Sequence, residues 1–69
     1  MTQIKISVNN DALDVIAPIS LTELIALKTL DDKGTAIARN NTIVSKRQWS
    51  TTYLDDGDIV DIFTLVAGG

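Results

Sequence analysis

The segment TQIKISVNNDALDVIAPISLTELIALKTL, residues 2–30, decides the fold, because it predicts a β-hairpin followed by a helix. Residues Thr2 to Val8 alternate between polar and apolar side chains, which is the pattern of a half-buried strand. The stretch Asn9-Asn10-Asp11 predicts a turn, since Asn and Asp tolerate left-handed backbone angles. Residues Ala12 to Ile16 predict a second strand that returns beside the first.

A helix is predicted directly after this hairpin. Ser20 followed by Glu23 has the spacing of a capping box, in which each side chain bonds the backbone of the other residue at a helix N-terminus. The helix should run from about Leu21 to Leu30, and Gly34 is the natural residue for a left-handed cap at its C-terminal end. Its apolar face is formed by residues at helical spacing: Leu21, Leu24, Ile25, Leu27 and Leu30.

The second half of the chain predicts further strands around a short helical turn. A hairpin, then a helix, then more strands is the order of an α+β fold, with one sheet and one main helix across it. A chain of 69 residues has room for one domain, residues 1–69. The predicted elements are strands at Thr35–Arg39 and Thr42–Val44 joined by a turn at Asn40-Asn41, a helical turn at Lys46–Trp49 capped by Ser45, a minor strand at Thr52–Leu54, a tight turn at Asp55–Asp58 and a long strand at Ile59–Val66.

The composition excludes several classes of partner. The chain has six Lys and Arg against nine Asp and Glu, a net charge of −3, which argues against a nucleic-acid binder and favours a partner protein with a basic surface. No apolar run reaches the roughly 20 residues of a membrane span, and the N-terminus lacks the pattern of a signal peptide. We therefore expect a cytoplasmic protein that binds neither nucleic acid nor membrane.

The chain contains no cysteine and no histidine, which excludes Cys–His and Ser–His–Asp catalysis and zinc sites built on those residues. The acidic run of Asp55, Asp56 and Asp58 lacks the spacing of a calcium loop, so we expect a solvated turn there. Trp49 and Tyr53 are too few for a platform that stacks on bases, and core packing is the expected role of both.

The last residues, Ala67-Gly68-Gly69, follow directly after the long apolar strand. Two terminal glycines arise by chance in about 0.5% of sequences, given a glycine usage of about 7%. Because glycine has no Cβ, such a backbone can enter a slot too narrow for side chains and can be threaded into another protein's active site. There an ATP-dependent enzyme can convert the Gly69 carboxylate to an acyl-adenylate. A frayed chain end is the alternative that the tail alone leaves open.

Several stretches of the chain match the pattern of one protein family. Through these stretches, nearly the whole chain resembles the ThiS family, which are the sulfur carriers of the thiamine pathway. The Asp-Gly-Asp turn followed by a strand into Ala-Gly-Gly is the most specific part, and Ser45 is a departure, since many members have proline there. The matching stretches are Ser20-Leu21-Thr22-Glu23-Leu24, Ala36-Ile37-Ala38-Arg39-Asn40, Ile43-Val44-Ser45-Lys46-Arg47-Gln48-Trp49, Asp56-Gly57-Asp58 and Phe63-Thr64-Leu65-Val66-Ala67-Gly68-Gly69.

The resemblance implies a ubiquitin-like β-grasp fold, with a mixed sheet of four to five strands and a flexible tail at residues 67–69. It also implies a carrier rather than an enzyme. An E1-like enzyme would adenylate Gly69 with ATP, and sulfur from a cysteine desulfurase would convert the carboxylate to a thiocarboxylate. Thiazole synthase would then take this sulfur to build the thiazole ring of thiamine. Gly68 and Ala67 would thread into these partners, and the carrier itself would bind no cofactor or metal.

The resemblance further implies a partner-binding surface of apolar residues on the exposed sheet face near the tail, matched here by Phe63 and Leu65. Strand alternation places Ile59 and Asp61 on the same face as these two residues. The charge of Asp61 indicates that this face is the outer one, which makes Phe63 a candidate anchor for a partner. The alternative is that Phe63 belongs to the core and Asp61 lies at an edge.

Three other functions remain open from the sequence. A carrier for molybdopterin synthesis or another sulfur pathway would use the same fold and the same diglycine end. A ubiquitin-like modifier would form isopeptide bonds with lysines of target proteins. A non-covalent interaction domain would keep its function without Gly68 and Gly69.

Overall fold

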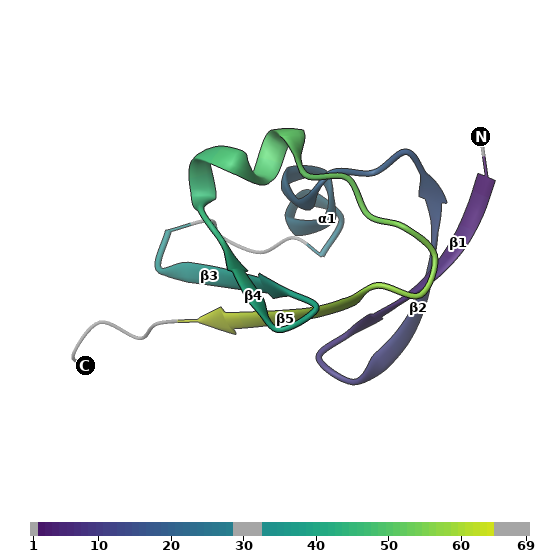
Figure 1. Cartoon of the computed structure of the whole chain (residues 1–69), viewed down its shortest axis with the longest axis horizontal. Helices are drawn as coiled ribbons and strands as arrows, with labels where there is room; N and C mark the ends of the chain where they lie inside the picture. The colour runs from purple at the N-terminus through teal and green to yellow at the C-terminus, as the bar shows by residue number, and fades with distance from the viewer. Residues whose placement is uncertain (1, 29–32, 65–69) are drawn as a thin grey trace.

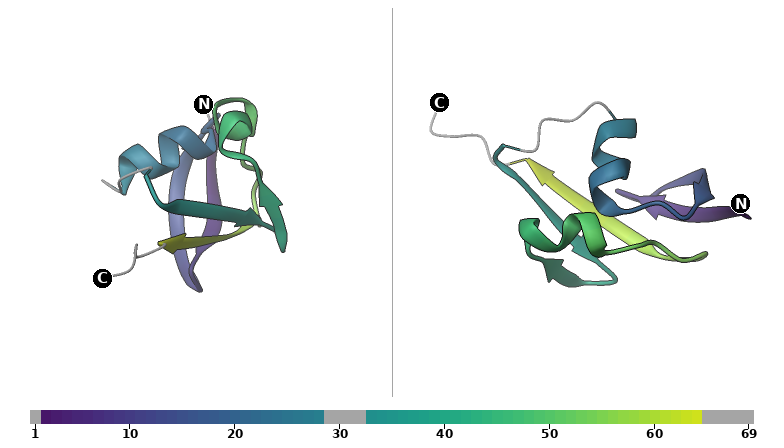
Figure 2. Two further views of the ribbon diagram at one scale, coloured as in Figure 1. Left: turned by 90° about the vertical axis from the view of Figure 1, so that its left-hand side faces the viewer. Right: turned by 90° about the horizontal axis from the view of Figure 1, so that it is seen from above.

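The fold is a five-stranded sheet with one main helix, in a computed structural model that describes residues 2–28 and 33–64 (Figure 1). Both helical segments lie on the same side of the sheet in the views of Figures 1 and 2. In chain order the elements are β1 (Thr2–Val8), β2 (Asp11–Ala17), α1 (Leu21–Leu27), β3 (Thr35–Arg39), β4 (Thr42–Val44), the 3₁₀ helix η1 (Lys46–Thr51) and β5 (Ile59–Thr64).

The sheet is mixed, as the resemblance implied. Its strand order is β2-β1-β5-β3-β4, so the last strand lies in the middle, between the first strand and the third. Strands β1 and β5 are parallel, and the other neighbouring pairs are antiparallel. Strand β5 is therefore held from both sides, by β1 and by β3.

Two tight hairpins confirm the predicted turns. Asn9 and Asn10 have φ angles of 51° and 71°, and Asn40 and Asn41 have 51° and 68°. Positive φ at both central residues is what a two-residue hairpin loop of the favoured twist requires, and Asn accepts it more readily than most residues. The second strand extends from Asp11 to Ala17, one residue beyond the prediction at each end.

The predicted capping box is present at the start of α1. The Ser20 hydroxyl accepts a hydrogen bond from the Glu23 backbone N–H at 3.2 Å, and the Glu23 carboxylate accepts one from the Ser20 N–H at 3.0 Å. The helix ends at Leu27, earlier than the predicted Leu30, which lies outside the described residues. Leu27 is 58% exposed, so its predicted place on the apolar face was wrong. Gly34 has the expected left-handed φ of 69° but precedes β3 rather than capping the helix, whose C-cap is Lys28.

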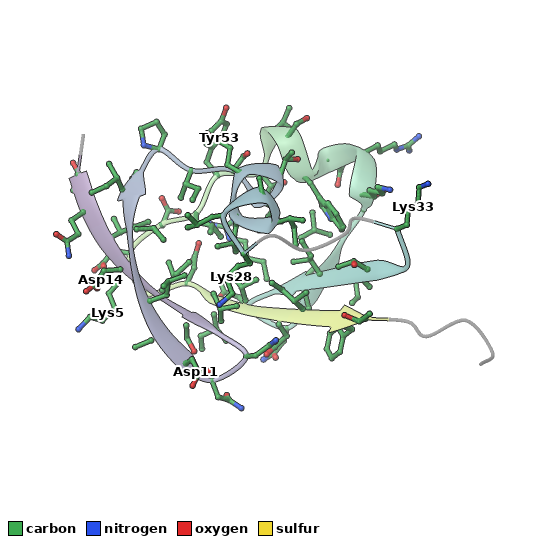
Figure 3. All side chains as sticks on the ribbon, turned by 180° about the vertical axis from the view of Figure 1, so that it is seen from behind. Lys5, Asp11, Asp14, Lys28, Lys33 and Tyr53 are labelled. Atoms are coloured by element: carbon green, nitrogen blue, oxygen red, sulfur yellow. The ribbon has the colours of Figure 1, made fainter. Side chains whose placement is uncertain are left out.

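The 3₁₀ helix η1 and the residues directly after it correct four predictions. It extends past Trp49 to Thr51, and the Ser45 side chain makes no capping hydrogen bond at its start. Trp49 is buried as expected and donates its indole N–H to the Val44 carbonyl oxygen at 3.0 Å. Tyr53 is 51% exposed instead of packed in the core, and the minor strand expected around it is a single bridge to Ser20 (Figure 3).

One core joins the inner face of the sheet to the helix. Its members come from every strand except β4, as well as from α1, η1 and the loops, so each element is held by burial of its apolar side chains. The buried residues of this cluster are Ile4, Ile6, Val8, Val15, Ile19, Leu21, Leu24, Ile25, Ile37, Trp49, Leu54, Val60 and Ile62.

Candidate functional site

Strand β5 positions the site that the sequence predicts. Phe63 lies within this strand, whereas Leu65, Ala67, Gly68 and Gly69 lie outside the described residues. The predicted strand continued to Val66, and its described part ends at Thr64. What the structure provides is the anchoring of β5 and the surface beside it.

A buried carboxylate fixes the start of β5. Asp58 is 7% exposed and accepts hydrogen bonds from Arg39 Nε at 2.9 Å, Asn40 Nδ2 at 3.1 Å and the Asp55 backbone N–H at 2.7 Å. Arg39 Nη2 also forms ion pairs with Asp58 at 2.8 Å and with the exposed Asp55 at 3.2 Å. Every oxygen of this buried group is therefore matched with a donor, as buried polar groups require.

These contacts change the acidity of Asp58. Burial by itself raises the pKa of the Asp58 carboxyl, because it penalises the charged form. The hydrogen bonds from the Asp55 backbone, Asn40 and Arg39, together with the Arg39 charge, outweigh burial and place the pKa below the ordinary value of 3.8. The carboxylate therefore stays ionised at neutral pH and holds the loop in place. The expectation of a solvated turn was right for the exposed Asp55 and Asp56 and wrong for Asp58.

The loop before β5 is also tied to the first strand. The Lys5 N–H donates to the Asp56 carboxylate at 2.7 Å, and the Gly57 N–H donates to the Lys5 carbonyl oxygen at 2.8 Å. Gly57 has a φ of 90°, which L-residues rarely adopt, so a glycine is needed at this corner. Within the described ranges, no group of three or more acidic side chains is placed to hold a metal ion.

The parallel pairing of β1 with β5 continues into the first hairpin turn. The Asn9 N–H donates to the Val60 carbonyl oxygen at 2.9 Å, and the Asn9 side-chain oxygen accepts from the Ile62 N–H at 2.8 Å. A side chain thus replaces the backbone partner that β1 no longer supplies. On the side of β1, hydrogen bonds hold β5 as far as Ile62, two residues before its described part ends at Thr64.

The outer face of β5 carries exposed apolar side chains, as alternation predicts. Ile59 is 48% exposed and Phe63 is 49% exposed, whereas Val60 and Ile62 between them are buried. The expected orientation of this face is confirmed, and the alternative in which Phe63 belongs to the core is wrong. Whether Phe63 anchors a partner stays a prediction.

The strand register adds a residue that sequence analysis missed. Phe63 lies opposite Ala36, and Asp61 lies opposite Ala38, which in turn pairs with Ile43 on β4. Ile43 is 66% exposed and shares the outer face with Phe63, since paired residues point to the same side of a sheet. We name this surface the outer apolar patch and define it by four residues: Ala36, Ile43, Ile59 and Phe63. Ala38 is on the same face but is only 5% exposed.

The place of Ile43 on the outer face could have been predicted from the sequence. The turn residues Asn40 and Asn41 indicate a two-residue hairpin, and such a loop fixes the pairing of the strands it joins. Counting back from that loop pairs Ala38 with Ile43, as observed. The strand Thr42–Val44 was too short for its alternation alone to assign a face.

The described part of the predicted site is therefore an apolar surface on β3, β4 and β5. The sequence has neither cysteine nor histidine, so it offers no thiol nucleophile and no imidazole base. In residues 2–28 and 33–64, no helix has the length and apolar character that crossing a membrane requires.

Comparison with known proteins identifies the family. Residues 6–69 match the model of the ThiS family. The sulfur carrier protein ThiS of Escherichia coli (strain K12) is 33% identical over 61 residues, which are 88% of this chain and 92% of that protein. The uncharacterised protein ycf40 of Porphyra purpurea is 33% identical over 66 residues, which are 96% of this chain and 93% of that protein.

The fold agrees with the sequence comparison. The crystal structure of the thiamine biosynthesis protein ThiS from Geobacter metallireducens superposes with a TM-score of 0.81 and 25% identity, and the match covers 96% of this chain and 100% of that chain. The predicted β-grasp fold, a mixed sheet with one main helix, is confirmed by this likeness. The chain belongs to the ThiS family of sulfur carrier proteins of thiamine biosynthesis.

Proposed function

We propose that this chain carries sulfur as a thiocarboxylate on Gly69 and donates it for thiazole formation in thiamine biosynthesis. The observation that carries this proposal is the family match, which continues to residue 69 and so includes the diglycine end. The similarity to the sulfur carrier of Escherichia coli over 88% of the chain supports it. The fold supports it too, because the strand that leads to these residues is held in the centre of the sheet.

The chemistry proceeds through an activated chain end. An E1-like enzyme joins the Gly69 carboxylate to the α-phosphate of ATP and releases pyrophosphate, which gives an acyl-adenylate. A persulfide, supplied through a cysteine desulfurase, attacks the acyl carbon and displaces AMP. A thiol reductant then cleaves the sulfur–sulfur bond and leaves the thiocarboxylate. The carrier contributes the carboxylate and no catalytic side chain, and ATP and the sulfur donor are substrates of its partners.

The outer apolar patch is the surface that docks these partners in our proposal. Phe63, together with Leu65 farther along the chain, is the apolar anchor next to the tail, and Ile43 and Ile59 widen the contact. Exposed apolar residues grouped on one face are typical of protein-binding surfaces. Gly68 and Ala67 are small enough to follow the terminal carboxylate into a narrow channel. We further propose that the protein acts in the cytoplasm together with its partner enzymes.

Mass spectrometry of the intact chain tests the proposal. Incubation with ATP, the cognate activating enzyme and a sulfur donor should raise the mass by the difference between one sulfur and one oxygen atom, with fragmentation locating the change at Gly69. A chain without Gly69 is the control and should stay unmodified. If the mass of the full chain stays unchanged in the presence of an active enzyme, the proposal is wrong.

The molybdopterin pathway is the alternative on the same fold, and the family match favours thiazole formation over it. Reconstitution with thiazole synthase separates the two, because only a thiazole carrier supports product formation there. A ubiquitin-like modifier would instead leave isopeptide adducts on lysines of other proteins.

A further inference from the structure

One charged side chain lies within the outer apolar patch. Asp61 is on the outer face of β5, between Ile59 and Phe63 along the strand, and it is partly buried. Across the sheet it pairs with Ala38, which pairs with Ile43 on the next strand. Apolar side chains therefore surround its carboxylate along the strand and on the side of β3 and β4.

The Asp61 carboxylate has no counter-ion on the described part of the chain. No ion pair or side-chain hydrogen bond joins it to another residue in the ranges 2–28 and 33–64, in contrast to Asp58, which Arg39 neutralises. The outward-facing positions beside it on β3 and β4 are alanine and isoleucine. On its remaining side lies the first hairpin turn, where Asn9 binds the Ile62 N–H. Among the residues that the structure describes, none neutralises this charge, which leaves its solvation to water.

Docking of a partner changes the solvation of the Asp61 carboxylate. A partner that covers Ile43, Ile59 and Phe63 also removes water from Asp61, because the carboxylate lies among them. A charge that is buried without a partner costs several kcal/mol, so an apolar surface opposite Asp61 would be rejected. A cation on the partner offsets the desolvation free energy of the Asp61 carboxylate. It also fixes the orientation in which the carrier docks. The net charge of −3 also favours a basic surface.

We propose that Asp61 is a specificity-determining residue, and that the enzyme which activates Gly69 places a lysine or arginine side chain against its carboxylate. This inference rests on the proposed function and names the chemistry of its partner. Arginine fits best, since its planar fork can bind both carboxylate oxygens while its stem covers the neighbouring apolar residues. Asp61 acts by selecting the partner and takes no part in the acyl chemistry.

The test is the steady-state kinetics of adenylation, followed as ATP–pyrophosphate exchange with the cognate activating enzyme. Asp61→Asn keeps the size of the side chain and removes its charge. It should raise KM for the carrier by about tenfold or more, equivalent to roughly 1.4 kcal/mol or more, with kcat within about twofold of wild type. Asp61→Glu keeps the charge and should restore most of the affinity. Added salt should raise KM of the wild type more than KM of Asp61→Asn.

Asp14→Asn is the matched control. Asp14 is an exposed carboxylate on the outer face of β2, where it pairs with Lys5, and Figure 3 shows the two side chains together on the first hairpin. The substitution changes the net charge by the same amount as Asp61→Asn but lies two strands from β5. Its KM should stay within about twofold of wild type, since a distant charge on the same face contributes only weakly in salt.

The outcomes separate this inference from the proposed function. If Asp61→Asn has the KM of wild type, or if Asp61→Leu binds more tightly than wild type, then no cation faces Asp61 and the inference is wrong while the carrier function stands. A fall in kcat without a change in KM would also overturn it, because selection of a partner acts on binding. If the wild-type chain itself supports no exchange, both the carrier function and this inference fail.

Discussion

Asp58 at the start of β5 and Arg39 at the end of β3 form a two-point contact, with Arg39 Nε at 2.9 Å and Nη2 at 2.8 Å from the same carboxylate oxygen. The contact joins the loop before the last strand to the neighbouring hairpin. It therefore couples the position of β5 to the stability of the sheet.

Replacing Asp58 should destabilise the protein strongly. Asp58→Ala leaves the Asp55 N–H and the Asn40 amide without their acceptor, and it leaves Arg39 with only an exposed partner. We expect a loss of about 2–4 kcal/mol in the free energy of unfolding, measured by urea denaturation. Asp55→Ala is the control. Its side chain is 82% exposed, and the loss should stay below about 1 kcal/mol. Equal losses in the two variants would contradict this role of the buried carboxylate.

The same carboxylate predicts a dependence of stability on pH. The pKa of Asp58 lies below 3.8 in the folded chain, so its ionised form stabilises the fold at pH values above that figure. This stabilisation is lost as the pH falls from about 4 through the folded-state pKa. Denaturation between neutral and acidic pH should show a steeper fall for wild type than for Asp58→Asn. Parallel curves for the two proteins would show that Asp58 does not titrate as expected.

Removing apolar side chains from the outer patch should weaken activation more than folding. Phe63 is 49% exposed and Ile43 is 66% exposed, so truncating either to alanine should cost about 1 kcal/mol of stability or less. We expect each substitution to raise KM of the activating enzyme for the carrier by about tenfold, since central apolar anchors dominate binding. Ile16→Ala is the matched control, because Ile16 is 54% exposed on the edge strand β2. A similar rise in KM for Ile16→Ala would show that the contact is not centred on the patch.

Changes in the diglycine end should separate function from stability. Gly68→Ala adds a Cβ where we propose that a narrow channel receives the chain, so adenylation should slow severely. Deletion of Gly69 should abolish sulfur transfer. The melting temperature should change little in either case, because a glycine has no side chain to bury. A large fall in melting temperature would mean that these residues pack against the domain.

Two serines with the same sequence signal should differ in their contribution to folding. Ser20 caps α1 through its hydroxyl, whereas the Ser45 side chain makes no capping bond at η1. Ser20→Ala should cost about 1 kcal/mol in chemical denaturation. Ser45→Ala should be close to neutral. A comparable cost at Ser45 would indicate a contribution from that side chain that its contacts do not explain.

Much of the fold could be predicted because its signals are local. The alternation of Thr2 to Val8, the paired asparagines of both hairpins and the capping box at Ser20 each depend on residues a few positions apart. Phe63 was placed on the outer face by the same reasoning, since alternation along one strand needs no knowledge of its neighbours. The helix end and the exposure of Tyr53 were not predicted correctly, because both depend on what packs against them.

Local patterns in the sequence were enough to predict the five strands of the sheet, both hairpin turns, the helix start and the face on which Phe63 lies, although they also predicted a minor strand that is only a bridge. Only the tertiary structure decided that β5 pairs with β1, that Asp58 is buried against Arg39 and that Ile43 and Asp61 share one surface. The physical reason is distance along the chain. The contacts that anchor β5 join Lys5 to Asp56 and Asn9 to Ile62, at separations of 51 and 53 residues. Such pairings form only when the whole sheet assembles around its core.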